Sequence, residues 1–150
     1  MKHKYNIIDV IPHGMPMSLL DTIEDYFDNG LVAMVTVRQD SLFCEPDGVP
    51  AWVGVEYMGQ AIAAYAGVSA RIASQPVKIG FLVSTRRYVS PCAHFPVGTS
   101  LYIRVSQITD NITGLQVFDC KITGKDIEIQ ANLNVFMPEN IDEFFKRKRE

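Results

Sequence analysis

The stretch at residues 52–73, WVGVEYMGQAIAAYAGVSARIA, decides the fold. It contains no proline and is rich in Ala, Val, Ile and Met, so it predicts one long helix. The polar residues before its last turns are Glu56 and Gln60, and the remaining positions are apolar on nearly every side. Such a helix belongs inside a fold. Its many Ala and Gly residues and its carboxylate argue against a membrane span.

Strands are expected on both sides of this helix. Residues 19–28 and 31–38 predict two strands, and Asn29-Gly30 between them predicts a two-residue type I′ turn with positive φ at both positions. Leu31, Ala33, Val35 and Val37 are expected to face one way. Val, Ile, Phe and Tyr predict four more strands at residues 77–89, 100–108, 115–122 and 127–136. Short helices are expected at residues 6–11 and 139–150.

The order of two strands, one buried helix and four strands predicts an α+β fold. A sheet that curls around the helix supplies the cover that its apolar surface needs. The length of 150 residues suits one domain, spanning 1–150, with a core of its own.

Composition excludes several classes of function. The net charge of −3 gives no reason to expect nucleic-acid binding. The three cysteines are widely spaced and form no CxxC pair, which argues against a disulfide framework or a zinc site. No signal-peptide pattern is visible at the N-terminus, so the cytoplasm is the expected location.

Glu56 is the most informative side chain of the helix. A carboxylate buried in an apolar setting is costly unless it is hydrogen-bonded or protonated, and Gln60 lies one turn later on the same face. Such a carboxylate suits a general acid or base near neutral pH. The structural alternative is a Glu56 that reaches an exposed helix edge or pairs with Arg86 or Arg87.

The start of the helix is a second candidate. The first amides, near Ala51 and Trp52, lack intrahelical partners, and the helix dipole favours negative charge there. Pro50 stands near the first turn, where its missing N–H does no harm. This end of the helix could therefore stabilise the negative charge that develops on a thioester carbonyl.

Two segments resemble the FabZ-type β-hydroxyacyl-ACP (acyl carrier protein) dehydratases. PHGMPMSLLD at residues 12–21 resembles the segment that opens those proteins, and PAWVGVEYMGQA at residues 50–61 resembles their central helix. Glu56 falls on the catalytic glutamate of the family, Gln60 on a glutamine four residues later, and Ala51 on the glycine whose amide polarises the thioester carbonyl. The sequence of residues 42–58 and 77–83 looks closest to the dehydratase-like proteins of aryl polyene pigment clusters.

The resemblance implies a hotdog fold, in which a curved antiparallel sheet wraps around a central helix. It also implies a dimer, either of two identical chains or with a related hotdog subunit, whose active sites are built from both chains. In the family, a histidine in a Gly-His-Phe-Pro motif removes the proton α to the thioester. The glutamate of the other chain helps to expel the β-hydroxyl group as water, without a metal or redox cofactor.

The Gly-His-Phe-Pro motif is missing from this chain. Its expected place falls on Leu42–Cys44, and His94-Phe95-Pro96 lies far past the helix, where we interpret it as a coincidence. The base could instead be His13, which stands in a rigid turn and titrates near neutral pH. It could also be Asp47 or Glu45, as acids serve in hotdog thioesterases, or a histidine of a related partner chain.

The leading hypothesis is a 3-hydroxyacyl-ACP dehydratase, or a dehydratase-like subunit, in fatty acid, polyketide or aryl polyene biosynthesis. Glu56 and His13 are its expected catalytic residues, and the expected substrate-binding residues are Ala51, Trp52, Gln60 and Asp47. The expected partner is an acyl carrier protein; the basic run at residues 146–149 is either a solvated tail or a contact for that acidic protein. The alternatives are a hotdog thioesterase, in which Glu56 or Asp47 activates water, and a non-catalytic partner or binder.

Overall fold

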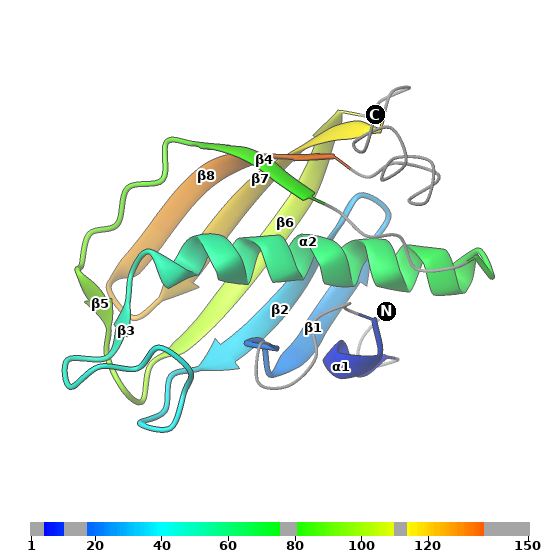
Figure 1. The fold of residues 1–150 in the computed structure, drawn as a ribbon. Helices are drawn as coiled ribbons and strands as arrows, with labels where there is room; N and C mark the ends of the chain where they lie inside the picture. The colour runs from blue at the N-terminus through cyan, green and yellow to red at the C-terminus, as the bar shows by residue number, and fades with distance from the viewer. Residues whose placement is uncertain (1–4, 11–17, 76–80, 110–113, 137–150) are drawn as a thin grey trace, which may run out of the picture.

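The computed structural model describes residues 5–10, 18–75, 81–109 and 114–136. In this part of the chain a six-stranded antiparallel sheet curves around one long helix, α2 (Val53–Ile72) (Figure 1). The sheet has the order β1-β2-β6-β7-β8-β4. Its strands are β1 (Thr22–Phe27), β2 (Gly30–Thr36), β4 (Phe81–Arg86), β6 (Ser100–Thr109), β7 (Leu115–Gly124) and β8 (Ile127–Phe136). The predicted α+β arrangement is confirmed.

Three short elements flank this frame. They are α1 (Ile7–Val10), β3 (Val49–Pro50) and β5 (His94–Phe95), and the last two pair as a separate antiparallel ladder. The ladder was not predicted, because two-residue strands leave no alternation to read. Of the short helices expected from the sequence, that at residues 6–11 is confirmed as α1, and that at residues 139–150 lies outside the described residues.

Helix α2 begins and ends within one residue of the predicted limits. It is not covered on every side, however. One stripe along it, which includes Glu56, Gly59, Ala63, Ala66 and Ala70, is only half-buried, whereas the positions between them are mostly buried against the sheet. The described residues therefore leave one face of the central helix partly open, and Glu56 lies at the beginning of that face.

The hairpin between β1 and β2 is present, but its turn differs from the prediction. Phe27 pairs with Gly30, so Asp28 and Asn29 form the turn, and neither of them has positive φ. Gly30 belongs to β2 instead, where an added Cβ would lie 2.1 Å from the carbonyl oxygen of Val105 on β6. Glycine is thus required for the close approach of a neighbouring strand.

Alternation along β2 brings the predicted residues into the core. Leu31, Ala33, Val35 and Val37 are buried, and the residues between them are half-buried. They pack with the buried side of α2 and with inward residues of β6, β7 and β8, among them Ile103, Phe118, Ile122 and Leu133. This core fixes the position of α2 across the sheet.

Helix α1 packs directly on α2 through a glycine. A Cβ at Gly67 would lie 1.9 Å from the carbonyl oxygen of Val10, so only glycine admits this contact without a shift of backbone. An Arg71 guanidinium N–H also donates to the carbonyl oxygen of Asp9 at 2.7 Å. No helix in the described ranges is long and apolar enough to cross a membrane.

Candidate active site

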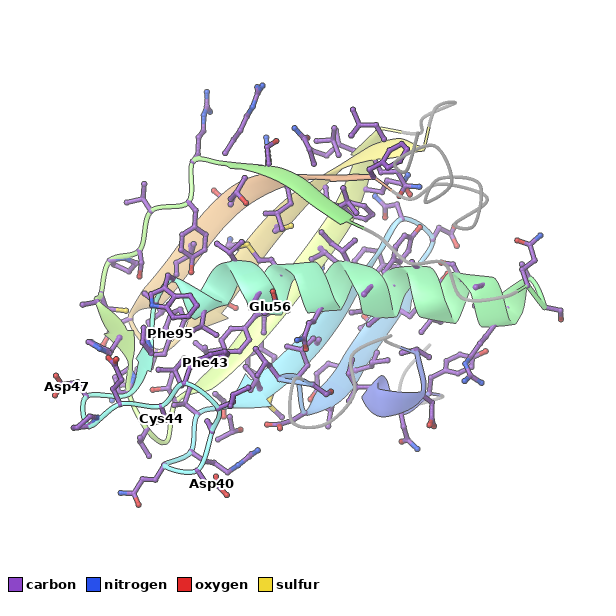
Figure 2. The ribbon with its side chains drawn as sticks, in the orientation of Figure 1. Asp40, Phe43, Cys44, Asp47, Glu56 and Phe95 are labelled. Atoms are coloured by element: carbon purple, nitrogen blue, oxygen red, sulfur yellow. The ribbon has the colours of Figure 1, made fainter. Side chains whose placement is uncertain are left out.

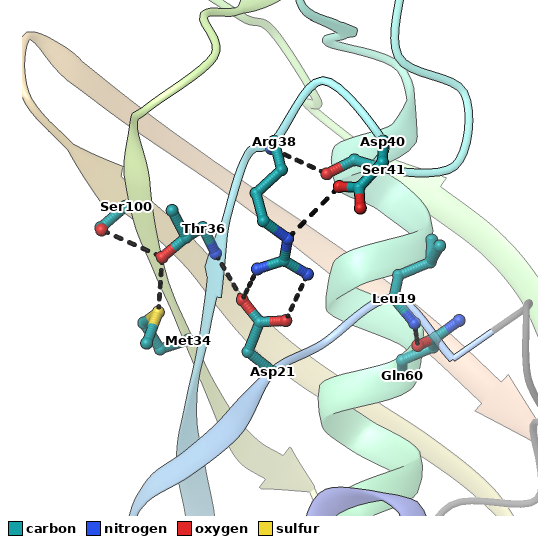
Figure 3. Close-up of polar contacts among 9 residues, drawn as sticks. All are labelled: Leu19, Asp21, Met34, Thr36, Arg38, Asp40, Ser41, Gln60 and Ser100. Atoms are coloured by element: carbon teal, nitrogen blue, oxygen red, sulfur yellow. Dashed lines mark hydrogen bonds and ion pairs between the residues drawn. The ribbon is translucent and has the colours of Figure 1, made fainter.

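Glu56 lies in the first turn of α2, on its half-buried face (Figure 2). The Gln60 side chain donates a hydrogen bond from Nε2 to Glu56 Oε1 at 3.2 Å, as the sequence predicted. Gln60 itself is fully buried, and its Oε1 accepts the backbone N–H of Leu19 at 2.8 Å (Figure 3). The segment that leads into β1 therefore fixes Gln60, and Gln60 in turn orients the carboxylate.

The surroundings of Glu56 differ in one respect from the expectation of a fully buried carboxylate. Within the single chain it is half-buried, because the open face of α2 has no cover in the described residues. Arg86 and Arg87, the partners weighed for a structural role, are both exposed, and neither makes a described contact with Glu56. The carboxylate is thus half-buried, and the Gln60 amide holds it.

A cavity of about 620 Å³ opens between the start of β1, the loop after β2 and the first half of α2. Among the described residues its lining includes Tyr57, which follows Glu56, but neither Glu56 nor Gln60. Its size falls within the range of small-molecule sites. Leu19, Leu42 and Tyr57 line it together, so it meets the loop, the helix and the segment bonded to Gln60. Other lining residues are Tyr5, Asn6, Ile7, Ser18, Leu20, Asp21, Thr22, Ile23, Val35, Arg38, Asp40 and Ser41.

One wall of the cavity is held by a paired arginine. Nη1 and Nη2 of Arg38 each donate to the Asp21 carboxylate at 3.2 Å, and the Thr36 N–H donates to the same group at 2.7 Å (Figure 3). These bonds join the residue before β1 to the end of β2. Because Arg38 is already paired with Asp21 and approached by Asp40 at 3.6 Å, this wall is not a free cationic site.

The Ala51 amide, expected to polarise the thioester carbonyl, already has a backbone acceptor in this structure. Its N–H donates to the carbonyl oxygen of Ala93 at 2.9 Å, so it is not available to a thioester. Trp52 comes next, and among the described residues no hydrogen bond uses its amide. The Trp52 side chain, at the N-terminal end of α2, is 62% exposed. The Trp52 amide therefore takes the place of the Ala51 amide as the candidate for binding an oxyanion.

The loop after β2 places an aromatic side chain beside this helix start. The Phe43 ring meets the Trp52 ring edge-on, with 5.5 Å between centroids. Phe43 has a φ of +69°, a costly conformation for a bulky residue that is found chiefly at functional or constrained positions. It belongs to Leu42–Cys44, the expected place of the family's histidine, which here carries Leu, Phe and Cys side chains.

Asp47 does not join the site. It lies exposed at the end of the loop and points away from Glu56 (Figure 2). The two backbone hydrogen bonds between Glu45 and Gly48, each 2.9 Å long, hold it in a tight turn there. In this conformation Asp47 therefore lies apart from Glu56, and its contact with a substrate stays a prediction.

His94 lies closer to the helix start than its sequence position suggested. It pairs with Pro50 in the β3–β5 ladder, and its Nε2 lies 2.8 Å from Glu45 Oε1. A two-residue ladder gives no periodic signal, so sequence reasoning could not find this placement. Its ring joins the loop to the strand that leads into α2, which is a structural role. His13, the other candidate base, lies outside the described residues.

The buried Tyr57 and the half-buried Tyr88 lie near the helix start, and neither was predicted. Burial raises the pKa of Tyr57 to about 12, with smaller contributions from Asp21 and Cys44. Burial also raises the pKa of Tyr88, with contributions from Cys92 and Tyr57. Both phenols therefore stay protonated at neutral pH and can act as hydrogen-bond donors.

These shifts predict a loss of stability in alkaline solution. A group whose folded pKa lies above its unfolded value stabilises the fold fully below the unfolded value and loses that contribution as pH rises towards the folded one. The unfolded values are 10.0 for Tyr57 and 9.0 for Cys120, and the folded values are about 12 for both. We expect the urea midpoint to be nearly constant from pH 7 to about 9 and to fall above it. Tyr57→Phe should make that fall shallower, and an unchanged profile would contradict this assignment.

Comparison with known proteins agrees with the arrangement of these elements. A family model described as ApeP-like, ApeP dehydratase, matches residues 5–146. A chain of the dehydratase heterocomplex ApeI:P from Xenorhabdus doucetiae superposes with a TM-score of 0.90 at 25% sequence identity, covering 99% of this chain and 100% of that one. No curated protein matches this chain in sequence.

More distant structures share the fold alone. A hypothetical thioesterase from Streptococcus pneumoniae, studied as a point mutant, is 16% identical and superposes with a TM-score of 0.57 over 77% of this chain and 88% of that one. A mutant thioesterase from Pseudomonas aeruginosa is 18% identical, with a TM-score of 0.55 over 78% of this chain and 80% of that one. These are hotdog proteins, so the predicted hotdog fold is confirmed. With a family model that covers nearly its whole length, the chain belongs to the ApeP-like dehydratase family.

Proposed function

We propose that this chain is a dehydratase-like subunit of aryl polyene biosynthesis that supplies Glu56 to a composite active site with a related hotdog subunit. The reaction is the elimination of water from a 3-hydroxyacyl thioester carried by an acyl carrier protein. The observation that carries the proposal is the Leu19–Gln60–Glu56 chain of hydrogen bonds. It holds a carboxylate in the first turn of α2, on the half-buried face of the helix. Family membership and the likeness to the ApeI:P heterocomplex support it.

In this scheme Glu56 acts as the acid at the β-hydroxyl group. The carboxyl proton passes to the leaving oxygen, the Cβ–O bond breaks, and water departs. Gln60 keeps the carboxyl group oriented, and the Trp52 amide meets the charge that develops on the thioester oxygen. These are the parts that the described residues of this chain provide.

The base that removes the α-proton is assigned to the partner subunit. Leu42–Cys44 stand where the family carries its histidine. His94, the one histidine among the described residues, is engaged by Glu45. His13 remains the alternative within this chain. If His13→Ala abolished turnover while the histidines of the partner were intact, the base would be His13 of this chain.

Product analysis tests the reaction class. A carrier protein loaded with a 3-hydroxyacyl group is incubated with this chain and a histidine-bearing hotdog subunit that resembles the other chain of the ApeI:P heterocomplex. The acyl group that remains on the carrier is then identified by mass spectrometry. We expect an enoyl thioester that stays on the carrier. Release of the free acid would replace the proposal with a thioesterase, the activity of several proteins that share only the fold.

A further inference from the structure

The start of α2 is held from outside by the connection that follows β4. The Ala51 N–H donates to the carbonyl oxygen of Ala93, and the Ala51 carbonyl oxygen accepts the Tyr88 hydroxyl at 2.5 Å. Just beyond, His94 and Phe95 pair with Pro50 and Val49 in the β3–β5 ladder. We call residues 88–95 the helix-start clamp, because it binds each residue from Val49 to Ala51.

Tyr88 is the side chain that closes this clamp. Its hydroxyl reaches Ala51 only because position 54 has no side chain: a Cβ there would lie 2.0 Å from the tyrosine oxygen and 3.0 Å from Ile122 Cδ1. The residue before it, Arg87, has a φ of +61°, a conformation that non-glycine residues rarely adopt. The chain thus accepts local strain immediately before Tyr88 points inward.

The rest of the clamp is also fixed by hydrogen bonds. The Ser90 hydroxyl donates to the Cys92 carbonyl oxygen at 2.7 Å and accepts the Cys92 N–H at 3.2 Å. The 2.8 Å contact between His94 and Glu45 joins the clamp to the loop that carries Phe43. Several hydrogen bonds therefore fix the helix-start clamp. The Tyr88 hydroxyl is the side-chain group of the clamp that bonds to the Ala51 carbonyl oxygen.

Resting on the function proposed above, we infer that Tyr88 is a positioning residue for the active site. It fixes the Ala51 peptide and so sets where the Trp52 amide and the Glu56 carboxylate, one and five residues later, meet the substrate. Misplacement of reacting groups by about 1 Å can cost on the order of a hundredfold in rate. A tyrosine that merely stabilised the fold would have no such selective effect.

The test compares two phenol-to-carbonyl hydrogen bonds, one at the start of α2 and one farther along the helix. Tyr88→Phe removes the bond to Ala51, and Tyr65→Phe removes the matched bond from Tyr65 to the carbonyl oxygen of Asp28, 2.9 Å long. In the complex with the partner subunit, we expect kcat to fall at least about tenfold in Tyr88→Phe, within the range that misplacement produces. KM should change little, and Tyr65→Phe should keep kcat although its Tm falls by a similar amount. Equal kcat in the two variants would overturn the inference.

The only tryptophan, Trp52, reports on the same geometry without turnover. Its emission maximum and its quenching by acrylamide should change in Tyr88→Phe and stay as in the unaltered chain in Tyr65→Phe. An unchanged Trp52 signal in Tyr88→Phe would also overturn the inference.

A double-mutant cycle adds a test of the contact itself. Gly54→Ala forces its new methyl group against the Tyr88 hydroxyl, so it should lower Tm by more in the unaltered chain than in Tyr88→Phe, where that oxygen is gone. Additive effects would contradict the proposed fit. Failure of the proposed function is distinguishable, because Glu56→Gln would then leave turnover intact while the Trp52 and double-mutant results stand.

Discussion

Replacing Glu56 with glutamine is expected to lower dehydration by the complex by about 10²–10⁴-fold, the contribution typical of a positioned general acid. The substitution keeps the size of the side chain and its place beside Gln60 but removes the proton that the leaving hydroxyl group requires. The measurement is the initial rate of enoyl thioester formation on a carrier-bound 3-hydroxyacyl substrate, with the variant in place of the unaltered chain.

Glu128→Gln is the matched control for that experiment. Glu128 lies on β8, exposed, with Lys121 as an ion-pair partner at 3.3 Å, and exposed pairs contribute little to stability. We expect its rate to equal that of the unaltered complex. A Glu56→Gln complex that turned over at more than half the normal rate would remove Glu56 from the chemistry.

Replacing Gln60 with leucine is expected to destabilise the chain by about 1–3 kcal/mol, because it leaves the Leu19 N–H without its side-chain acceptor in a largely buried place. It also removes the amide that orients Glu56, so turnover should fall together with stability. Urea unfolding gives the first quantity, and the rate of the complex at a temperature where the variant is folded gives the second.

Gln130→Leu makes the same chemical change on the exposed face of β8 and is the control. It should leave both the unfolding free energy and the rate nearly unchanged. If Gln60→Leu behaved like Gln130→Leu, the Leu19–Gln60–Glu56 chain of hydrogen bonds would have no functional role.

The sequence predicts those parts of this fold that depend on periodic patterns. The limits of α2, the inward row of β2 and the Gln60–Glu56 contact all follow from side-chain spacing along regular elements. Alternation and helical periodicity are local properties, so they can be read from the sequence without knowledge of which segments lie nearby in space.

The parts that depend on contacts between distant segments could not be predicted. The Ala51 amide is unpaired in an isolated helix, but Ala93, more than forty residues later, accepts its hydrogen bond. Gly30 looks like a turn residue, yet its role is to admit the backbone of β6. Tyr88 and the β3–β5 ladder carry no pattern at all in the sequence.

The same limit applies to the candidate site. Glu56 and Gln60 were found because they are the polar residues of an apolar helix, a contrast visible in one segment. Asp47 was included because acidic loop residues next to such a helix often carry chemistry, whereas the turn between Glu45 and Gly48 directs it away. Its placement depends on the path of the loop, which sequence alone does not reveal.

The measurement that tests the central claim most directly is a titration of this chain into a fixed amount of its His-bearing hotdog partner. Dehydration of the carrier-bound 3-hydroxyacyl substrate is followed at each ratio, and size-exclusion chromatography with light scattering gives the mass of the complex. We expect negligible turnover by this chain alone, and activity that rises with its addition until the two chains are equimolar. Full activity of this chain alone, or of the partner without it, would contradict a composite site that depends on Glu56.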